Sequence, residues 1–463
     1  MATTIRTKSE FLSFCKEGNA VKVKKALDEV RSDASAMNDL LNCTSDYPSH
    51  DWMPEFGGGK LFEFKPLHYA CAFGHHEVAR MLVDAGSRVD EWVLRGTRAS
   101  NITSLHLASF FVGNVDLVKF LLDVGAMSMI DLTNSQSSNG ATPLMMAALG
   151  GHDKVASLLL EAGAVIDIQA NDGRTALMIA AEEDNFEVGS LLIGAGADLN
   201  CQDKCGQTVL MKTLDALEQR QRRGWYYRRK NEKRQREVGS YLSQVRVLVE
   251  SGAQVNVRDK RGQTALIMVT SGGHDEIANI LVGAGADVNV QAHNGRNALM
   301  IATNEENLEV MRMLISAGAH LNFQDNDGET ALMRAVCPAD KECYRGETTD
   351  GYSGGGYGYG YNDSTSKKDI EEEGSNLEQV SVLLEAGALV DLQNKKGETA
   401  LIKAAKVGDA KIARALLFAG AKADISDNTC RTAMKWARER QHRNAVKIFR
   451  SYHQTRGAAA PAA

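Results

Sequence analysis

The sequence predicts an all-α fold in which short helical repeats stack into a solenoid. A Gly-Ala pair stands at matching positions of seven repeats, and four of the six intervals between these pairs are 33 residues long. The other two intervals, of 56 and 69 residues, equal one period plus an insertion of 23 or 36 residues. The pairs begin at Gly163, Gly196, Gly252, Gly285, Gly318, Gly387 and Gly420. A fixed period of this length is typical of stacked repeats, because one unit is too small to bury its own apolar face.

The composition agrees with short, closely packed helices. The 463 residues include only six prolines and 6% aromatic residues, and 43% are hydrophobic. A net charge of -6 gives no general attraction to nucleic acids or anionic membranes. No run approaches the roughly 20 apolar residues of a membrane span, and residues 1–11 lack the apolar core of a signal peptide. We therefore expect a soluble monomer in the cytoplasm or the nucleus.

The eight cysteines predict free thiols rather than a disulfide framework or a metal site. Cys201 with Cys205, and Cys337 with Cys343, stand at spacings that suggest metal ligands. However, no second Cys pair or His pair follows either of them at zinc spacing. No cofactor motif is present in the sequence, and we expect neither a metal nor a cofactor.

One repeat shows how the pattern produces a turn followed by two antiparallel helices. The Asp-Gly pair at 172–173 is typical of a turn, since glycine adopts positive φ without a steric penalty. Thr175 stands at the N-cap position of a short, Ala-rich helix. In the second helix, Val188, Leu191 and Leu192 keep i, i+3, i+4 spacing and should form its buried face. Matching leucines of later repeats are Leu281, Leu314, Leu383 and Leu416.

Several motifs that recur at this period resemble the ankyrin repeat. The Thr-Pro-Leu-His signature of that family is partly kept at 65–68, 104–106 and 142–145, and later copies read Thr-Ala-Leu-Met or Thr-Ala-Leu-Ile at 175–178, 264–267, 330–333 and 399–402. The ending Gly-Ala-Asp-Val-Asn is intact at 285–289. The resemblance covers nearly the whole chain. It implies helix-turn-helix units with turn or hairpin fingers, a protein-binding function, and a structural rather than catalytic role for His68 and His106.

We predict about eleven units, the first and last of which act as caps. Residues 1–41 form a degenerate N-terminal cap, 42–59 an irregular link, 60–427 the repeat stack, 428–456 a polar C-terminal cap and 457–463 a disordered tail. The buried face of the first cap is expected to consist of Phe11, Leu12, Phe14, Val23, Ala26 and Leu27. Two insertions interrupt the stack, each between the first and second helix of its repeat.

The first insertion, 215–243, holds nine Lys/Arg and four Asp/Glu, a net charge of +5. It lacks proline and both flanks are good helix formers, so we expect a hairpin made by lengthening both helices. Its tip is expected at 224–227, where Trp225, Tyr226 and Tyr227 are adjacent. Two alternatives stay open. The basic residues and aromatic rings could bind RNA or single-stranded DNA, or residues 228–236 could be a nuclear-import signal.

The second insertion, 337–376, is acidic and of low complexity. It holds four Lys/Arg against nine Asp/Glu, a net charge of -5, and its centre consists largely of Gly and Tyr. Such a composition does not form a packed core, so a flexible loop is expected.

No catalytic constellation is present, which leaves the repeat surface as the candidate for function. The residue two positions before each turn tip forms a near-continuous series of glutamines: Gln169, Gln202, Arg258, Gln291, Gln324, Gln393 and Ser426. This series is either a hydrogen-bonding strip for an extended peptide or a set of amides that pair with one another and bind no partner. The charge at the tips also changes, from Lys260 and Arg261 to Asp327.

We therefore predict a non-enzymatic scaffold or adaptor that binds a partner protein on the concave repeat surface. The first alternative is a nucleic-acid-binding protein that uses the basic aromatic insertion, and the second is a regulatory subunit of an enzyme.

Overall fold

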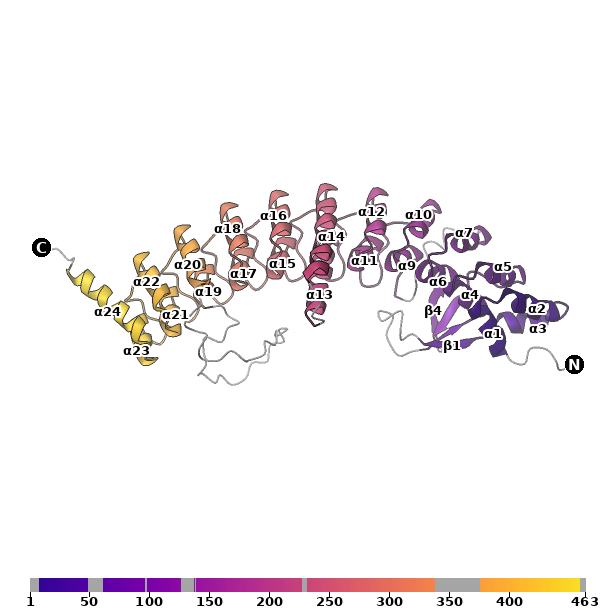
Figure 1. Ribbon diagram of the computed structural model, residues 1–463, viewed down its shortest axis with the longest axis horizontal. Coiled ribbons are helices and arrows are strands. Elements are labelled where there is room, and N and C mark those ends of the chain that lie inside the picture. The colour runs from indigo at the N-terminus through magenta and orange to yellow at the C-terminus, as the bar shows by residue number, and fades with distance from the viewer. Residues whose placement is uncertain are drawn as a thin grey trace. The chain divides into compact units, whose positions relative to one another are not determined.

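The computed structural model describes residues 8–48, 61–95, 98–125, 137, 139–226, 231–337 and 375–458 (Figure 1). The chain forms two compact units, Met1–Lys260 and Arg261–Ala463, each taken by itself below. In both units, pairs of antiparallel helices follow one another in sequence order, and like helices of successive pairs pack together. The predicted stack of helical repeats is therefore confirmed.

The first unit begins with three helices, α1 (Lys8–Glu17), α2 (Ala20–Val30) and α3 (Ala34–Leu41), rather than the two expected for a cap. Helix pairs follow: α4 (Pro66–Ala72) with α5 (His76–Asp84), α6 (Ser104–Phe111) with α7 (Val115–Val124), α9 (Pro143–Gly150) with α10 (Asp153–Glu161), and α11 (Ala176–Glu182) with α12 (Phe186–Gly194). The unit ends with two long helices, α13 (Val209–Tyr226) and α14 (Asn231–Glu250).

The described residues of the second unit form five helix pairs. They are α15 (Ala265–Gly272) with α16 (Asp275–Gly283), α17 (Ala298–Asn304) with α18 (Leu308–Ser316), α19 (Ala331–Val336) with α20 (Ser375–Glu385), α21 (Ala400–Val407) with α22 (Ala410–Phe418), and α23 (Ala433–Glu439) with α24 (Arg443–Ala458). The acidic insertion between α19 and α20 lies, apart from its ends, outside the described residues, as do 459–463 of the expected tail.

The first unit also contains a small antiparallel sheet, which leaves the fold mostly helical, as predicted. Its strands follow the order β1 (Ser45–Pro48), β2 (Leu61–Phe64), β3 (Trp92–Arg95) and β4 (Arg98–Thr103). The expectation of an irregular link over 42–59 is wrong for β1, which pairs with β2 from Ser45 opposite Phe64 to Pro48 opposite Leu61. Aromatic and β-branched residues favour pleated structure, and in the sheet Phe64 and Val93 are fully buried.

The apolar core follows the repeat. Leu192 and its matching leucines Leu281, Leu314, Leu383 and Leu416 are all fully buried, as predicted. Leu191 and Phe14, in contrast, are only half-buried, so their assignment to the core was wrong. Thr175 caps its helix as expected, since its hydroxyl accepts a hydrogen bond from the Met178 N–H at 3.3 Å.

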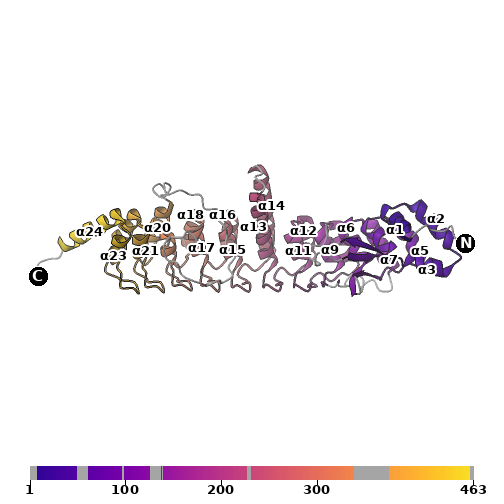
Figure 2. The same cartoon turned by 90° about the horizontal axis from the view of Figure 1, so that it is seen from below.

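The expected hairpin in the basic insertion is confirmed as far as the backbone is described. Helix α13 has 18 residues and α14 has 20, about twice the length of the other repeat helices in this unit. Figure 2 shows the hairpin rising past α11 and α12, on the side opposite to the turn tips.

One cysteine departs from the expectation of free thiols. Cys337 is disulfide-bonded. The cysteines at 15, 43, 71, 201, 205 and 430 are free, so none of them is its partner.

Candidate functional site

The turn tips of successive repeats are joined by backbone hydrogen bonds. In the first unit the Lys204 N–H donates to the carbonyl of Asp172 at 2.8 Å, and in the second the Asn326 N–H donates to the carbonyl of Asn294 at 3.1 Å. Gly173 has φ +86°, and a Cβ there would lie 2.6 Å from the Lys204 nitrogen. The glycine of the turn is thus required both by its own conformation and by the close approach of the next tip.

The series of glutamines forms hydrogen bonds within the protein. Gln169 Nε2 donates to the carbonyl of Gly173 in its own turn, at 2.8 Å, and to the carbonyl of Gln202 in the next, at 2.9 Å. Gln202 donates in the same way to Gly206 and Arg258. In the second unit, Gln291, Gln324 and Gln393 each donate to the glycine carbonyl of their own turn and to the next residue of the series, ending at Ser426.

This arrangement accounts for glutamine at these positions without any partner molecule. The amide nitrogen has two donor hydrogens. One bonds within its own turn and the other bonds to the turn of the next repeat; we call each of these turns a finger. The partners are backbone carbonyls rather than other amides, and the Arg258 carbonyl accepts from Gln202. A direct role of the series in partner binding stays a prediction.

The other predicted binding residues lie on the surface of the fingers or outside the described side chains. Lys260, Arg261 and Asp327 are all exposed at turn tips. Trp225 and Tyr226 form the end of α13, where only the backbone is described, and Tyr227 lies outside the described residues.

Where the residue after the glutamine is Asp, its carboxylate fixes the turn. Asp203 Oδ1 accepts hydrogen bonds from the N–H groups of Cys205 and Gln207, both at 2.8 Å, and Oδ2 pairs with Lys212 Nζ at 2.8 Å. Asp325 accepts in the same way from Asp327 and Glu329 and pairs with Arg334.

The partner of this turn residue stands nine positions later, on the first helix. Where the turn carries Asp, the helix usually carries a donor: Asp203 with Lys212, Asp325 with Arg334, and Asp427 with Trp436, whose Nε1 donates to Oδ2 at 2.7 Å. Where the turn carries Ala, the helix carries Ile, as at Ala170 with Ile179 and Ala292 with Ile301. One turn Asp is an exception, since Asp259 stands nine positions before Met268. Apart from that exception, these repeats carry either a polar or an apolar pair at the two positions.

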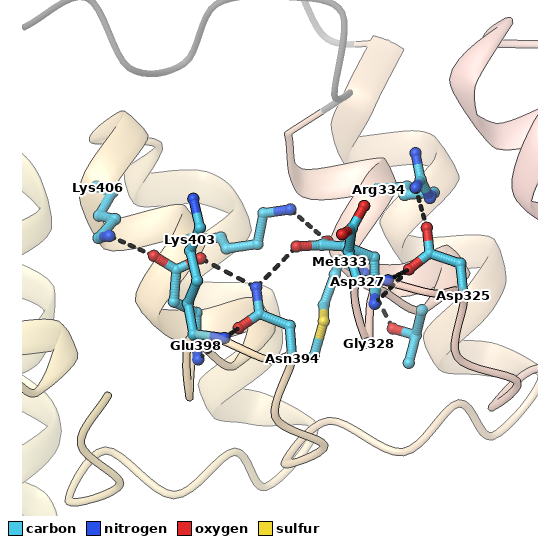
Figure 3. Close-up of polar contacts among 12 residues, drawn as sticks. Asp325, Asp327, Gly328, Met333, Arg334, Asn394, Glu398, Lys403 and Lys406 are labelled. Atoms are coloured by element: carbon cyan, nitrogen blue, oxygen red, sulfur yellow. Dashed lines mark hydrogen bonds and ion pairs between the residues drawn. The ribbon is translucent and has the colours of Figure 1, made fainter. Parts of the chain in front are cut away.

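The polar pairs of the second unit join into a buried network (Figure 3). Lys403 pairs with Glu329 of the preceding repeat, Lys406 pairs with Glu398, and Asn394 Nδ2 donates to both carboxylates. Burial raises the pKa of Asp325, but hydrogen bonds from Arg334 and from backbone N–H groups outweigh it, so the pKa lies below its ordinary value. The pKa of Glu398 is lowered too, since Lys406 and Asn394 outweigh its burial.

A small recess opens beside the fingers between α9 and α11. Met145, Met146 and Ile179 line it, and its rim carries Arg174, which pairs with Asp172 at 2.7 Å. Its volume of about 60 Å³ is far below the several hundred Å³ of a typical small-molecule site. The recess therefore has room for a partner's side chain but not for a cofactor.

The α13–α14 hairpin is fastened to the preceding repeat through Asp184. Arg220 Nη1 donates to Asp184 Oδ2 at 3.0 Å, and Nη2 donates to the Glu183 carbonyl at 3.0 Å. Gln244 Nε2 and Ser240 Oγ donate to Asp184 Oδ1 at 2.7 and 3.4 Å. We refer to Asp184, Arg220, Ser240 and Gln244 as the clasp. None of them was singled out from the sequence.

The two signature histidines are structural, as the motif implied. His106 Nδ1 accepts the Thr103 N–H at 3.2 Å, and Nε2 lies 3.1 Å from the Ala141 carbonyl of the next repeat. His68 bridges Lys65 and Glu91 similarly. Burial is the main cause that lowers the pKa of His68 to about 4, so its ring is neutral at physiological pH.

Comparison with known proteins agrees with this geometry. The family model described as ankyrin repeats in three copies matches residues 33–132, 105–203, 237–325, 273–345 and 370–456. The matches cover most of the chain, and the protein therefore belongs to the ankyrin-repeat family. Members of this class bind other proteins through their repeats.

Individual relatives match over short stretches. Probable E3 ubiquitin-protein ligase XBOS32 of Oryza sativa is 27% identical over 165 residues, 24% of this chain and 32% of that protein. E3 ubiquitin-protein ligase XBAT32 of Arabidopsis thaliana is 33% identical over 95 residues, 20% of this chain and 17% of that protein. The mouse serine/threonine-protein kinase TNNI3K is 31% identical over 111 residues, which are 22% of this chain and 12% of that protein. The chain spans less than a third of each of these relatives.

The described residues contain no group of three or more His, Cys, Asp or Glu side chains that could hold a metal ion. Within the same residues, no helix is both long and apolar enough to span a bilayer.

Proposed function

We propose that the chain is a non-enzymatic adaptor that binds a partner protein through its finger tips and first helices. One observation carries the proposal: the residues that hold the fingers repeat, while the residues exposed at the tips differ. Gln and Gly recur inside the fingers, whereas the tips present Asp172, Lys260 or Asp327. A rigid backbone with varied side chains favours specific binding, because little ordering free energy is lost on association.

Charge reversal at one tip tests the proposal. We expect a partner captured by the wild-type protein to be lost or weakened in the variant Lys260→Glu/Arg261→Glu. The matched control is Lys24→Glu/Lys25→Glu, which makes the same change of charge at exposed positions of α2, far along the sequence from any finger. Equal loss of the partner in both variants would show a non-specific effect of charge and contradict the assignment to the fingers.

A second candidate function is nucleic-acid binding by the hairpin. It is supported by the net charge of +5 over 215–243 and by the clasp, which holds the base of the hairpin against its neighbour. Titration with a labelled 20-residue poly-uridine at increasing salt tests it, because phosphate contacts produce a steep fall of affinity with salt. Affinity that is independent of salt, or unchanged when 221–238 is deleted, would exclude it. The cytoplasmic or nuclear location is likewise still a prediction.

A further inference from the structure

The two last repeats differ in charge from the rest of the chain. Residues 395–456 hold fifteen Lys/Arg and five Asp/Glu, a net charge of +10. Since the whole chain has a net charge of -6, the remainder carries -16. A polar cap needs only hydrophilic residues to stay soluble, so a surplus of one sign at this end calls for its own explanation.

The last helix presents three of these cations as a stripe. Arg443, Lys447 and Arg450 stand at i, i+4 and i+7 of α24 and are all exposed. This spacing places them on one face of the helix. Ala445 and Phe449, which are fully buried, hold the opposite face against the stack.

Helix α22, which packs beside α24, continues the same surface. Its exposed residues Lys411, Arg414 and Phe418 also stand at helical spacing, and Arg414 matches Lys447 one repeat later. Phe418 is 87% exposed, more than any other large hydrophobic side chain of the described residues. We define the C-terminal basic face as these two sets: Lys411, Arg414, Phe418, Arg443, Lys447 and Arg450.

The cations of this face are not neutralised within the described part of the protein. None of the five makes an ion pair there, whereas nearby cations do: Lys406 pairs with Glu398, and Arg431 pairs with Glu439 at 3.0 Å. The face also has a sharp border. At the positions of α20 that match Lys411 and Phe418, the chain carries Glu378 and Glu385.

We propose that the C-terminal basic face docks an acidic polypeptide segment that covers Phe418 with an apolar side chain. The unpaired cations supply charge complementarity, and the exposed Phe418 ring, at helical spacing from Lys411 and Arg414, supplies an apolar anchor. Nucleic acid fits less well, since a long polyanion would run onto the acidic border and a single aromatic ring gives little base stacking. This surface is made by second helices and is independent of the finger tips.

Fluorescence anisotropy with a defined probe tests the proposal. The probe is a labelled 14-residue peptide of Glu, Asp and Ser with one central Leu, and the full chain is titrated into it. We expect the triple variant Arg443→Glu/Lys447→Glu/Arg450→Glu to weaken binding about tenfold or more, and Phe418→Ser about fivefold. The matched control Lys24→Glu/Lys25→Glu/Lys154→Glu, which changes the net charge equally at exposed sites, should bind as wild type.

Three outcomes would overturn the proposal. Equal weakening in the triple variant and the matched control would mean that only net charge matters. A probe in which Ser replaces Leu, if it bound as tightly, would remove the apolar anchor. Tighter binding of a 14-residue oligo-thymidine, or of phosphatidylserine vesicles, than of the peptide would assign the face to nucleic acid or membrane. Circular dichroism and thermal melting of each variant confirm that lost binding does not arise from unfolding.

Discussion

Asp184 lies in a left-handed turn, with φ +61°, and its carboxylate receives the guanidinium of Arg220 at 3.0 Å. Matching turns of the same unit use glycine, as at Gly74, Gly113 and Gly151, where positive φ carries no penalty. A left-handed Asp costs about 1 kcal/mol relative to glycine. The clasp explains why Asp rather than Gly stands at position 184. Its carboxylate bonds the long hairpin to the repeat before it.

We expect the variant Asp184→Asn to loosen the hairpin. Asn tolerates the left-handed turn but carries no charge for Arg220, so hydrogen exchange at the base of α13 and α14 should become faster. Arg220→Gln should have the same effect. The control Glu306→Gln alters the matching left-handed residue of another repeat and should leave the exchange of the hairpin unchanged. Unchanged exchange in both clasp variants would show that packing alone holds the hairpin.

Replacing the buried pair of Asp325 and Arg334 by an apolar pair tests whether the two kinds of pair are equivalent. Asp325→Ala should cost about 3 to 5 kcal/mol, because it leaves the Arg334 guanidinium buried without its counter-ion. The double variant Asp325→Ala/Arg334→Ile recreates the pair found at Ala292 and Ile301. It should recover much of the unfolding free energy, as measured by urea denaturation. A double variant less stable than the single one would contradict the equivalence of polar and apolar pairs.

Leu192 and Leu191 form a matched pair of neighbours for a test of the linear stack. Leu192 is fully buried and Leu191 only half-buried. Leu192→Ala should cost about 2 to 5 kcal/mol, and Leu191→Ala should cost less. Since a linear stack couples only neighbours, hydrogen exchange should rise in the repeat of Leu192 and those beside it. Uniform loss of protection across all repeats would be incompatible with a stack.

His68 should make the stability of the first unit depend on pH. Its pKa is about 4 when folded and 6.5 as a free side chain. As pH falls below 6.5 the unfolded chain binds a proton first, so stability is full above that pH and is lost progressively down to about 4. The loss amounts to about 3 kcal/mol. Exchange of the α4 amides at several pH values measures it, and His68→Gln should show a shallower dependence. An equal dependence would assign the effect to other groups.

The features of a single repeat could be predicted from sequence, because they depend on residues close together in the chain. Thr175 as a cap and Leu192 as core follow from local spacing. The hairpin followed from the absence of proline and from good helix formers on both flanks. Leu191 was misassigned because the i, i+3, i+4 rule does not fix how wide the buried face of a helix is.

The missing features depend on contacts between repeats. Asp184 meets Gln244 sixty positions later, and no local pattern marks that pair. In the small sheet, strand β2 likewise pairs with β3 of the following repeat, with Glu63 opposite Leu94. For the glutamine series, the sequence predicted the period. It did not predict that the acceptors of the glutamine side chains are backbone carbonyls. The pairs nine positions apart, such as Asp203 with Lys212, could have been found by comparing repeats.

Site-specific photo-crosslinking tests most directly whether the finger tips bind the partner. A benzoylphenylalanine is placed at Lys260 or Asp327, on the tips, and at Glu187, an exposed position of the second helix α12. We expect the two tip positions to crosslink one and the same protein in cells of the source organism, and Glu187 to crosslink it weakly or not at all. Crosslinks to that protein from Glu187 alone, or with equal yield from all three positions, would contradict the account.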